Sequence, residues 1–375
     1  MIQQCIAVFL RAETTAHEYR APIVPRDVLQ LVEHGIPVYV QSCRHRAFSD
    51  QEYQDAGAVV TVSTWYETRR RDGLDPDHTL ILGLKSIDVA HLRGHHHMYF
   101  SHSFKGQCGA TYILEAFRSS GSILWDMEYF LCDANRRRIS FGFYAGICGC
   151  ILGLLQYVRR KEGRPPLSSL VPWTSYESAM NHLCGEIFGA SSSSSSSSFL
   201  DQARAIAIVG YGGECARGVR HVLDYVGLSS SVALLGRNDA KIGSFAMTFN
   251  CIKLDPSKSD QDGVPGAPEE EEEEEVWDQL STEMMVDISC DVSKSNHPMR
   301  HLYTEETTWD EPVRVRRCGE TDVDVICISN LPSLLPRDSS AHFSRQCTSL
   351  LVSETRENES SWTHCHDAFA KRVYG

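Results

Sequence analysis

One stretch of the sequence decides the fold class: residues 205–235 read AIAIVGYGGECARGVRHVLDYVGLSSSVALL. The apolar run 205–209 predicts a buried strand, and the glycines from Gly210 to Gly213 predict a tight turn. Residues 214–226 predict a helix, and residues 232–235 predict the next strand. Two strands joined through a helix form a βαβ unit, in which the strands run parallel. We therefore expect an α/β fold built on parallel sheets.

The glycine turn is a candidate nucleotide site. Backbone amides in such a turn, together with the N-terminus of the following helix, can cradle a pyrophosphate. Gly210 and Gly212 fit the first two positions of G-x-G-x-x-G, Gly213 is an extra glycine, and Cys215 stands where the third glycine is expected. The pattern alone therefore leaves two interpretations open, a dinucleotide site and a plain tight turn.

The end of the next strand bears on which dinucleotide would bind. A carboxylate at this place normally binds the ribose hydroxyls of NAD. The sequence instead has Gly236 and Arg237, a combination that accommodates a 2′-phosphate, with Asp239 two residues further on. NADP is therefore possible beside NAD, unless Asp239 turns back toward the ribose.

The first 125 residues repeat the alternation of strands and helices. We expect strands at 5–10, 36–40, 58–62, 79–84, 98–101 and 123–125. A helix is expected at 25–34, and the capping-box pattern from Ser49 to Glu52 predicts the start of another that stops at Gly57. Residues 141–160 predict one long helix, whose glycines at intervals of three or four residues suggest tight packing between two domains.

Length, charge and cysteine content narrow the class of protein. A chain of 375 residues predicts two domains, and a net charge of −13 without a basic stripe argues against nucleic acid as a partner. The longest apolar stretch, 141–155, is too short and too rich in glycine to predict a membrane span. Scattered cysteines and no export signal favour a cytoplasmic protein. The serine tract 191–198 and the acidic segment 253–275 predict flexible insertions.

Candidate proton-transfer groups follow two predicted strands. Lys85 comes after an apolar run, where a side chain points toward the ligand-binding edge of a parallel sheet, and partial burial would lower the pKa of its ammonium group. His102 follows another strand and is succeeded by Lys105 and Gln107. Imidazole suits proton transfer near neutral pH. For Lys85 and His102, a polar residue that merely ends a strand is the competing interpretation.

Candidate anion-binding and acidic groups surround them. Arg20, in the loop after the first strand, could clamp a carboxylate, and Arg136 and Arg137 could bind a substrate rich in carboxylates. Asp126 and Glu128 lie two residues apart on or just after a strand, so we expect them to share a face and to orient an amine or tune Lys85. Surface arginines and a solvated basic turn remain the alternatives.

The histidines at 95, 96 and 97 invite comparison with a zinc site. Adjacent residues on an extended segment point to opposite faces, so the three rings could not bind one ion. None of the predicted helices carries a His-x-x-x-His pair, and the cysteines form no matching pairs with the spacing of metal ligands. We therefore expect no metal.

These pieces occur in an order that resembles one family, the lysine-forming saccharopine dehydrogenases of the fungal type. The alanine dehydrogenase and transhydrogenase folds share the architecture but not the whole set of motifs. The matching motifs run from about residue 8 to residue 345. They are Leu10–Thr14, Arg20–Pro22, Ile81–Lys85, His95-x-His97, Phe100–His102 with Lys105 and Gln107, Trp125–Glu128, Arg136–Arg137, Phe141–Gly146, Gly210-x-x-Gly213-x-Cys215-x-x-Gly218, Asn250–Ile252, Val286–Asp291 and Leu331–Arg337.

The resemblance implies a reaction and roles for the residues. Family members cleave saccharopine oxidatively, with NAD, to lysine and 2-oxoglutarate on the aminoadipate route of lysine biosynthesis. Lys85 then matches the general base and His102 the group that activates water. The residues that match substrate binders are Arg20, Lys105, Gln107, Asp126, Glu128, Arg136 and Arg137; those on the cofactor side are Gly210, Gly212, Gly213, Cys215, Arg237, Asp239, Cys251, Asp291, Ser329, Asn330 and Leu331.

The resemblance also implies an architecture. It predicts two Rossmann-like, doubly wound domains around a cleft: a substrate-binding and catalytic domain of residues 1–140 and 331–375, and a dinucleotide-binding domain of residues 141–330. It matches Cys215 and Cys251 to a pair that can form a disulfide near the nucleotide, and it implies a monomer.

The sequence departs from the family pattern on the nucleotide side. Family members usually have a basic residue at Glu214, a glycine at Ala216, an acid at Gly236, and Asp-His at Ser329-Asn330. These departures leave two alternatives to the lysine-forming enzyme. One is a homologue without turnover that binds saccharopine or lysine as a sensor or a partner. The other is a dehydrogenase of another amino or imino acid.

Overall fold

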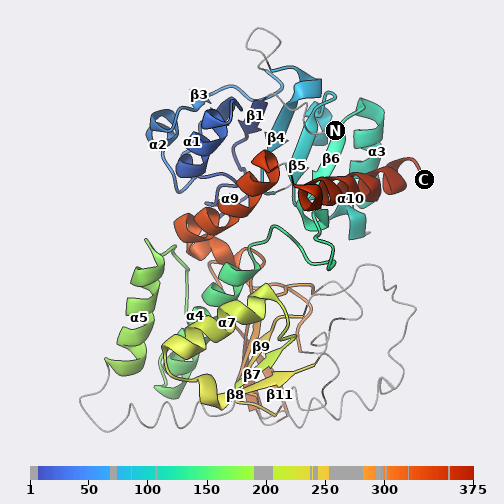
Figure 1. Ribbon diagram of the computed structural model, residues 1–375. Helices are drawn as coiled ribbons and strands as arrows, with labels where there is room; N and C mark the ends of the chain where they lie inside the picture. Colours follow the sequence, from blue (N-terminus) through green and yellow to red (C-terminus); the bar gives the residue numbers. More distant parts are fainter. Residues whose placement is uncertain are drawn as a thin grey trace. The chain divides into compact units, whose positions relative to one another are not determined.

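The chain divides into two compact units in the computed structural model. Unit 1 comprises Met1–Phe141 with Pro336–Gly375, and unit 2 comprises Gly142–Leu335; the sequence suggested boundaries at 140/141 and 330/331 (Figure 1). The structure describes residues 7–67, 74–85, 87–105, 109–189, 206–236, 239, 244–252, 282–292, 297, 299, 302–319, 321–353 and 355–375. The expected insertions at 191–198 and 253–275 lie outside these ranges.

Unit 1 is built on a parallel sheet with the strand order β3-β2-β1-β4-β5-β6. This is the strand order of a Rossmann fold. Its strands are β1 Ala7–Leu10, β2 Val38–Gln41, β3 Val59–Thr61, β4 Thr79–Leu82, β5 His96–Tyr99 and β6 Ile123–Asp126. Its helices are α1 Pro25–Glu33, α2 Asp50–Asp55, α3 Ala110–Ser120, α9 Pro336–Val352 and α10 Arg356–Val373, with short 3-10 turns η3 Pro76–His78, η4 Val89–His91, η5 Ser103–Lys105 and η6 Met127–Tyr129.

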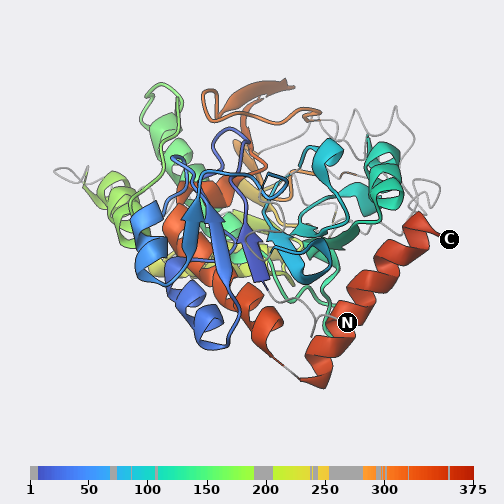
Figure 2. The ribbon, with the colours of Figure 1, turned by 90° about the horizontal axis from the view of Figure 1, so that it is seen from above.

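The two faces of this sheet pack against different partners. Alternate strand residues such as Val8 and Leu80 join one apolar cluster with side chains of α1, α2, α9 and α10. The intervening residues Phe9 and Ile81 pack against Trp65. Buried apolar residues on both faces are expected for a parallel sheet. Figure 2 shows α10 along the side of unit 1, ending at the C-terminus, and this helix contacts β6 and α3.

Unit 2 carries the second sheet, in the order β11-β12-β10-β9-β7-β8. All neighbours run parallel except β11 and β12, so an antiparallel strand forms one edge, which the sequence did not predict. The strands are β7 Ile206–Val209, β8 Val232–Leu235, β9 Met247–Asn250, β10 Met284–Asp287, β11 Arg314–Cys318 and β12 Thr321–Cys327. The helices are α4 Gly142–Lys161, α5 Tyr176–Phe188 and α7 Glu214–Tyr225, with the 3-10 turns η7 Ser229–Ser231 and η8 Leu331–Leu334.

The glycines of α4 explain how this helix packs. A Cβ atom at Gly146 would lie 1.9 Å from the carbonyl oxygen of Cys215, and one at Gly218 would lie 2.0 Å from the carbonyl oxygen of Phe143. The backbones of α4 and α7 therefore touch where these glycines face each other. Gly153 instead packs against Phe249 of β9. The prediction of tight packing is confirmed, but these contacts lie inside unit 2, so the expectation of an interdomain helix is wrong.

Helix α4 is long and apolar enough to cross a membrane by length and composition. The expectation that this segment is too short to cross a membrane is therefore wrong, because the helix runs for 20 residues. Most of its side chains are buried inside the protein, as expected for the core helix of a unit whose sheet it covers.

Candidate active site

Lys85 lies in a turn just beyond β4 rather than at the end of the strand. β4 ends at Leu82, and Gly83 to Lys85 continue as a turn. The carboxylate of Glu13 accepts hydrogen bonds from the N–H groups of Leu84 at 2.6 Å and Lys85 at 3.1 Å. The guanidinium of Arg11 donates to the carbonyl of Lys85. Side chains from the loop after β1 thus hold the backbone at Lys85.

His102 lies in the loop that follows β5. Its φ of +58° is in the left-handed region, which L-residues other than glycine seldom occupy. Its ring Nδ1 is 3.7 Å from Oε2 of Glu128, and its side chain is 43% exposed while that of Glu128 is 5% exposed. One edge of the imidazole therefore faces a buried acid, and the ring remains accessible to solvent.

Glu128 connects His102 to an arginine. The sequence argument placed Asp126 and Glu128 on one face of a strand, but β6 ends at Asp126 and Glu128 lies on the 3-10 turn η6. Asp126 caps this turn by accepting the N–H of Glu128 at 3.0 Å. Oε1 of Glu128 accepts from Nη2 of Arg137 at 2.5 Å. The pair is therefore brought together by a capped turn and not by strand alternation.

The other predicted arginines differ in burial. Arg20 is buried, and its Nε and Nη2 bind the two oxygens of Glu18 at 2.7 and 2.5 Å. Its guanidinium also lies 4.2 Å from the centre of the Phe141 ring. Arg136 is exposed. Arg20 thus already holds one internal carboxylate through two donors, and its Nη1 has no hydrogen bond to the described residues.

Three predicted site residues lie wholly or partly outside the described residues. Only the backbone of Lys105 is described, at the end of η5. Gln107 and Arg237 lie outside the described residues.

The glycine turn of unit 2 has the features of a phosphate-binding loop. Gly210 has a φ of +80°, and a Cβ there would meet the backbone of Ile252 at 2.9 Å, so glycine is required. Cβ atoms at Gly212 and Gly213 would have nothing within 4 Å. Helix α7 begins after Gly213 without a side-chain cap. Open space in front of uncapped amides fits a pyrophosphate.

The cysteines expected near the nucleotide are Cys215 and Cys251. Cys215 and Cys251 are not joined in the structure, and burial raises the pKa of Cys251 well above its ordinary value. The disulfide that the resemblance allows is therefore not formed here. Elsewhere in unit 2, the Sγ atoms of Cys290 and Cys327 are 3.2 Å apart.

The loop after β10 is organised by one buried acid. Asp287 accepts from the backbone N–H groups of Ser289 and Cys290 at 3.1 and 3.2 Å and pairs with His297 at 3.0 Å. Burial opposes ionisation of Asp287, but hydrogen bonds from His297, Ser289 and Tyr303 and the charge of His297 together lower its pKa. The predicted cofactor residue Asp291 follows this loop and is half-buried.

Three further predicted cofactor residues lie between β12 and η8. Ser329 is exposed, whereas Asn330 and Leu331 are buried. The side-chain oxygen of Asn330 accepts from Nε1 of Trp309 at 2.7 Å, so this residue serves packing at least. Beyond β8, Asp239 is half-buried and its N–H donates to the carbonyl of Gly236 at 3.4 Å.

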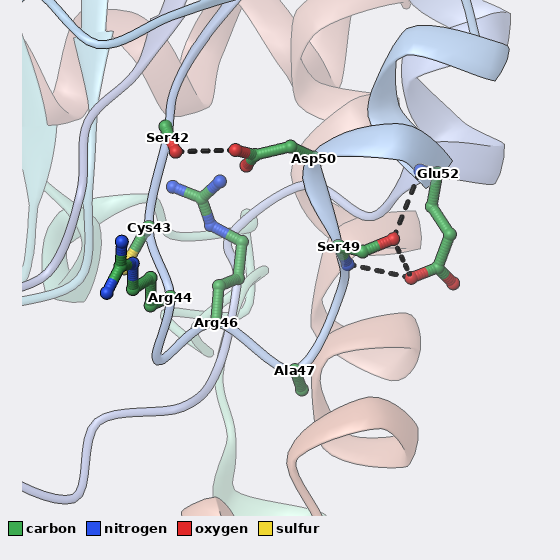
Figure 3. Close-up of a pocket in the computed structure, with 8 residues that line it drawn as sticks. All are labelled: Ser42, Cys43, Arg44, Arg46, Ala47, Ser49, Asp50 and Glu52. Atoms are coloured by element: carbon green, nitrogen blue, oxygen red, sulfur yellow. Dashed lines mark hydrogen bonds between the residues drawn. The ribbon is translucent and has the colours of Figure 1, made fainter.

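A cavity of about 410 Å³ opens beyond β2 in unit 1, lined by residues between Ser42 and Glu52 (Figure 3). Figure 3 shows the guanidinium of Arg46 extended toward Ser42 and Asp50. Nη2 of Arg46 donates to the carbonyls of Gln41 and Arg11 at 3.0 and 3.3 Å. None of the predicted site residues lines this cavity. The candidate site therefore consists of the polar groups beyond β4, β5 and β6.

The three adjacent histidines all engage neighbouring groups. His95 and His97 each contact the carbonyl of Leu92, at 3.1 and 3.2 Å, and His96 bonds to Nε1 of Trp125 at 3.2 Å. Within the described ranges, no cluster of three or more histidine, cysteine or acidic residues could hold a metal ion.

Known proteins that are similar to this chain come from the families that the sequence motifs resemble. The N-terminal domain family of alanine dehydrogenase and PNT matches residues 9–148. Enzymes described as saccharopine dehydrogenase [NAD(+), L-lysine-forming] are similar over nearly the whole chain: that of Yarrowia lipolytica is 28% identical, covering 98% of both chains, and that of Emericella nidulans is 29% identical, covering 98% of this chain and 97% of its own. The chain is thus similar to lysine-forming saccharopine dehydrogenases over nearly its whole length.

A solved structure agrees with the fold. An L-alanine dehydrogenase superimposes with a TM-score of 0.59 at 16% identity, covering 97% of this chain and 94% of its own. The prediction of an α/β fold with Rossmann-like units is confirmed.

Sequence reasoning missed the acids that partner the predicted groups. It named Arg11 and Glu13 only as part of a motif and assigned no role to Glu18. The signal was present, since two arginines, at 11 and 20, and two glutamates, at 13 and 18, lie within ten residues next to an apolar strand. Charges so close to a core are expected to pair.

Proposed function

We propose that the protein catalyses the NAD-dependent oxidative cleavage of saccharopine to lysine and 2-oxoglutarate, with NADP as a possible second cofactor. The observation that carries the proposal is the contact of buried Glu128 with both His102 and Arg137. This group lies after β5 and β6, and Lys85 lies after the neighbouring strand β4. Carboxyl ends of adjacent parallel strands meet at one edge, where ligands bind in such folds.

The chemistry requires proton transfers that these residues can perform. Lys85 takes the proton from the secondary amine of saccharopine, which frees the nitrogen lone pair to form an imine as the neighbouring carbon loses hydride. The nicotinamide cofactor, when bound, accepts that hydride. His102 then takes a proton from water that attacks the imine, and the product collapses to a ketone and a primary amine.

Charged residues recognise the substrate. Saccharopine carries three carboxylates, and guanidiniums suit them because their planar donors bind carboxylates in pairs. In the proposal, Arg137, Arg136 and Nη1 of Arg20 bind these groups. Glu128 holds the imidazole of His102 and offsets the charge of the protonated ring.

The residues of unit 2 suit the cofactor. The uncapped start of α7 and the open space at Gly212 and Gly213 would hold its pyrophosphate. Glu214, in the first turn, carries the wrong charge for this task, but it pairs with Arg217 at 2.6 Å. Gly236 is exposed and leaves room for either ribose or a 2′-phosphate.

The test follows the nicotinamide absorbance in purified protein mixed with lysine, 2-oxoglutarate and either NADH or NADPH. Oxidation that requires all components, and that the Lys85→Met variant loses, would support the proposal and identify the preferred cofactor. If the folded protein turns over neither cofactor but binds lysine or saccharopine, the alternative of a sensor without turnover replaces it. Turnover only with another amino acid and its keto acid would favour the third possibility.

A further inference from the structure

We propose that Arg11 and Glu13 form a clamp that positions Lys85 for proton transfer; this inference rests on the proposed function. Both residues precede Lys85 by more than seventy positions. Neither is assigned to substrate or cofactor. They act on the backbone of Lys85, so we regard them as positioning residues and not as catalytic groups.

The clamp binds backbone groups at Leu84 and Lys85, which lie beyond the last pair between β1 and β4. The ladder between β1 and β4 ends at the pair Leu10 and Leu82. The chain after β1 then supplies side chains instead: Glu13 accepts the N–H groups of Leu84 and Lys85, and Arg11 donates to the carbonyl of Lys85. Donor and acceptor of the Lys85 backbone are thus both bound from the same loop. The other neighbour, β5, contributes the N–H of Phe100 to the carbonyl of Leu84 at 3.2 Å.

The clamp is a buried ion pair and not a surface one. Nη1 of Arg11 lies 3.3 Å from Oε2 of Glu13, and the two side chains are 4% and 5% exposed. A buried ion pair gains little net stability over apolar residues of the same volume, because desolvation offsets the attraction between the charges. Three of its hydrogen bonds converge on one turn, at Leu84 and Lys85, and that turn carries the proposed base.

Gly83 fixes where the guanidinium lies. A Cβ at this position would fall 2.2 Å from Nε and 2.4 Å from Cζ of Arg11. The guanidinium therefore lies directly against the backbone of the turn. A methyl group at Gly83 would displace Arg11 without removing any charge, which gives a second way to disturb the clamp.

The first experiment compares Glu13→Gln and Gly83→Ala with the wild type in the saccharopine assay. A glutamine keeps the volume but presents only one acceptor, so one of the two N–H groups faces another donor. We expect kcat to fall about 10- to 100-fold, as small misplacements of reacting groups do. The pH profile of kcat/KM should shift in both variants, while the dissociation constant of the nicotinamide cofactor stays unchanged.

Asp27→Asn is the matched control. Asp27 is a buried acid of the same unit that accepts from Ser344 at 2.5 Å. Its replacement should lower stability while leaving the shape of the pH profile unaltered. If Asp27→Asn shifts the profile as Glu13→Gln does, the effect is one of general stability and the clamp is refuted.

A double-variant experiment tests whether Glu13 acts through Lys85. In a Lys85→Ala background, methylamine added to the buffer replaces the missing amine. The Glu13→Gln change should then alter the rescued rate less than twofold. A loss as large as in the wild-type background would overturn the proposal.

A final readout needs no turnover. Reductive methylation with labelled formaldehyde gives each lysine a carbon signal, and the Lys85 signal is assigned from its loss in Lys85→Arg. Glu13→Gln and Gly83→Ala should shift the titration of this signal, whereas Asp27→Asn should not. An unchanged titration refutes the clamp even if the enzyme is active. If the wild type shows no turnover, the proposed function is refuted, and the titration of Lys85 still tests the clamp.

Discussion

The contact between α4 and α7 can be tested with one matched pair of substitutions, Gly146→Ala and Gly185→Ala. Both add a methyl group to a helix of unit 2. At Gly185, on the exposed face of α5, nothing lies within 4 Å of the new Cβ. Alanine is the better helix former there, and we expect a gain of about 0.5–1 kcal/mol in the free energy of unfolding.

At Gly146 the same substitution should lower the free energy of unfolding instead of raising it. The Cβ would lie 1.9 Å from the carbonyl oxygen of Cys215, and ordinary contacts begin near 3.4 Å. The helices would have to separate by roughly 1.5 Å, which also loosens the contact at Gly218. Overpacking of this kind typically costs about 1–3 kcal/mol, against a helix-propensity gain of about 1. The atoms in the way belong to backbone, which relaxes poorly, so we expect the upper end of this cost and a net loss of about 2 kcal/mol.

The assay is pulse alkylation of buried thiols across a urea series, read by mass spectrometry. Cys148 and Cys150 of α4 report on unit 2, and Cys347 and Cys365 report on unit 1. Gly146→Ala should lower the urea midpoint of the α4 thiols, Gly185→Ala should raise it slightly, and the unit 1 thiols should not change. A Gly146→Ala midpoint equal to or above that of the wild type would show that the helices are not in backbone contact.

Two more predictions concern buried polar side chains. Burial lowers the pKa of His97 to about 3 from 6.5. The stability linked to this depressed pKa is fully present above pH 6.5. As the pH falls from 6.5 toward 3, the free energy of unfolding should decrease by up to about 1.4 kcal/mol per pH unit. Hydrogen exchange of unit 1 peptides across this range should show the loss, and His97→Phe should flatten it; an equally steep dependence in the variant would rule His97 out. Asn330→Leu should lower the urea midpoint of unit 2 by an amount equivalent to about 1–3 kcal/mol, because Nε1 of Trp309 would lose its acceptor. Asn330→His should keep most of the stability, and a harmless Asn330→Leu would contradict this role.

The sequence predicted the regular elements well where local patterns specify them. The eight strands expected from apolar runs all have counterparts within two residues at each end, in so far as those ends are described. The capping box at Ser49 and Glu52 forms as expected. β9, β10, β11 and β12 were not predicted as strands. β9 and β10 are only four residues long and arginines dominate β11, so length and alternation do not distinguish these three from loops. The alternating run of β12 was a signal that the sequence analysis missed.

The site was predicted as separate residues but not as contacts. Chain order showed that Lys85, His102 and Glu128 follow different strands. It could not show that Glu128 lies on a 3-10 turn, because Asp126 stops the strand by capping that turn. Nor could it show that Arg20 faces Glu18, since the pairing depends on how the loop after β1 folds back. Such details depend on tertiary structure, which overrides local patterns.

The departures from the family pattern affect charge more than packing. The histidine expected at Asn330 could also accept the hydrogen bond of Trp309, so the substitution preserves this contact and removes a titratable ring. Glu214 keeps a partner in Arg217 and lies in an exposed turn. The glycine turn retains the positive φ of Gly210 and the open space beside it. The backbone of the cofactor site is thus kept while charges near it change. Such changes are expected to alter cofactor preference and the pH dependence of turnover before they abolish binding. Comparing turnover with the two nicotinamide cofactors therefore separates an enzyme from a non-catalytic relative more sharply than a measurement of stability does.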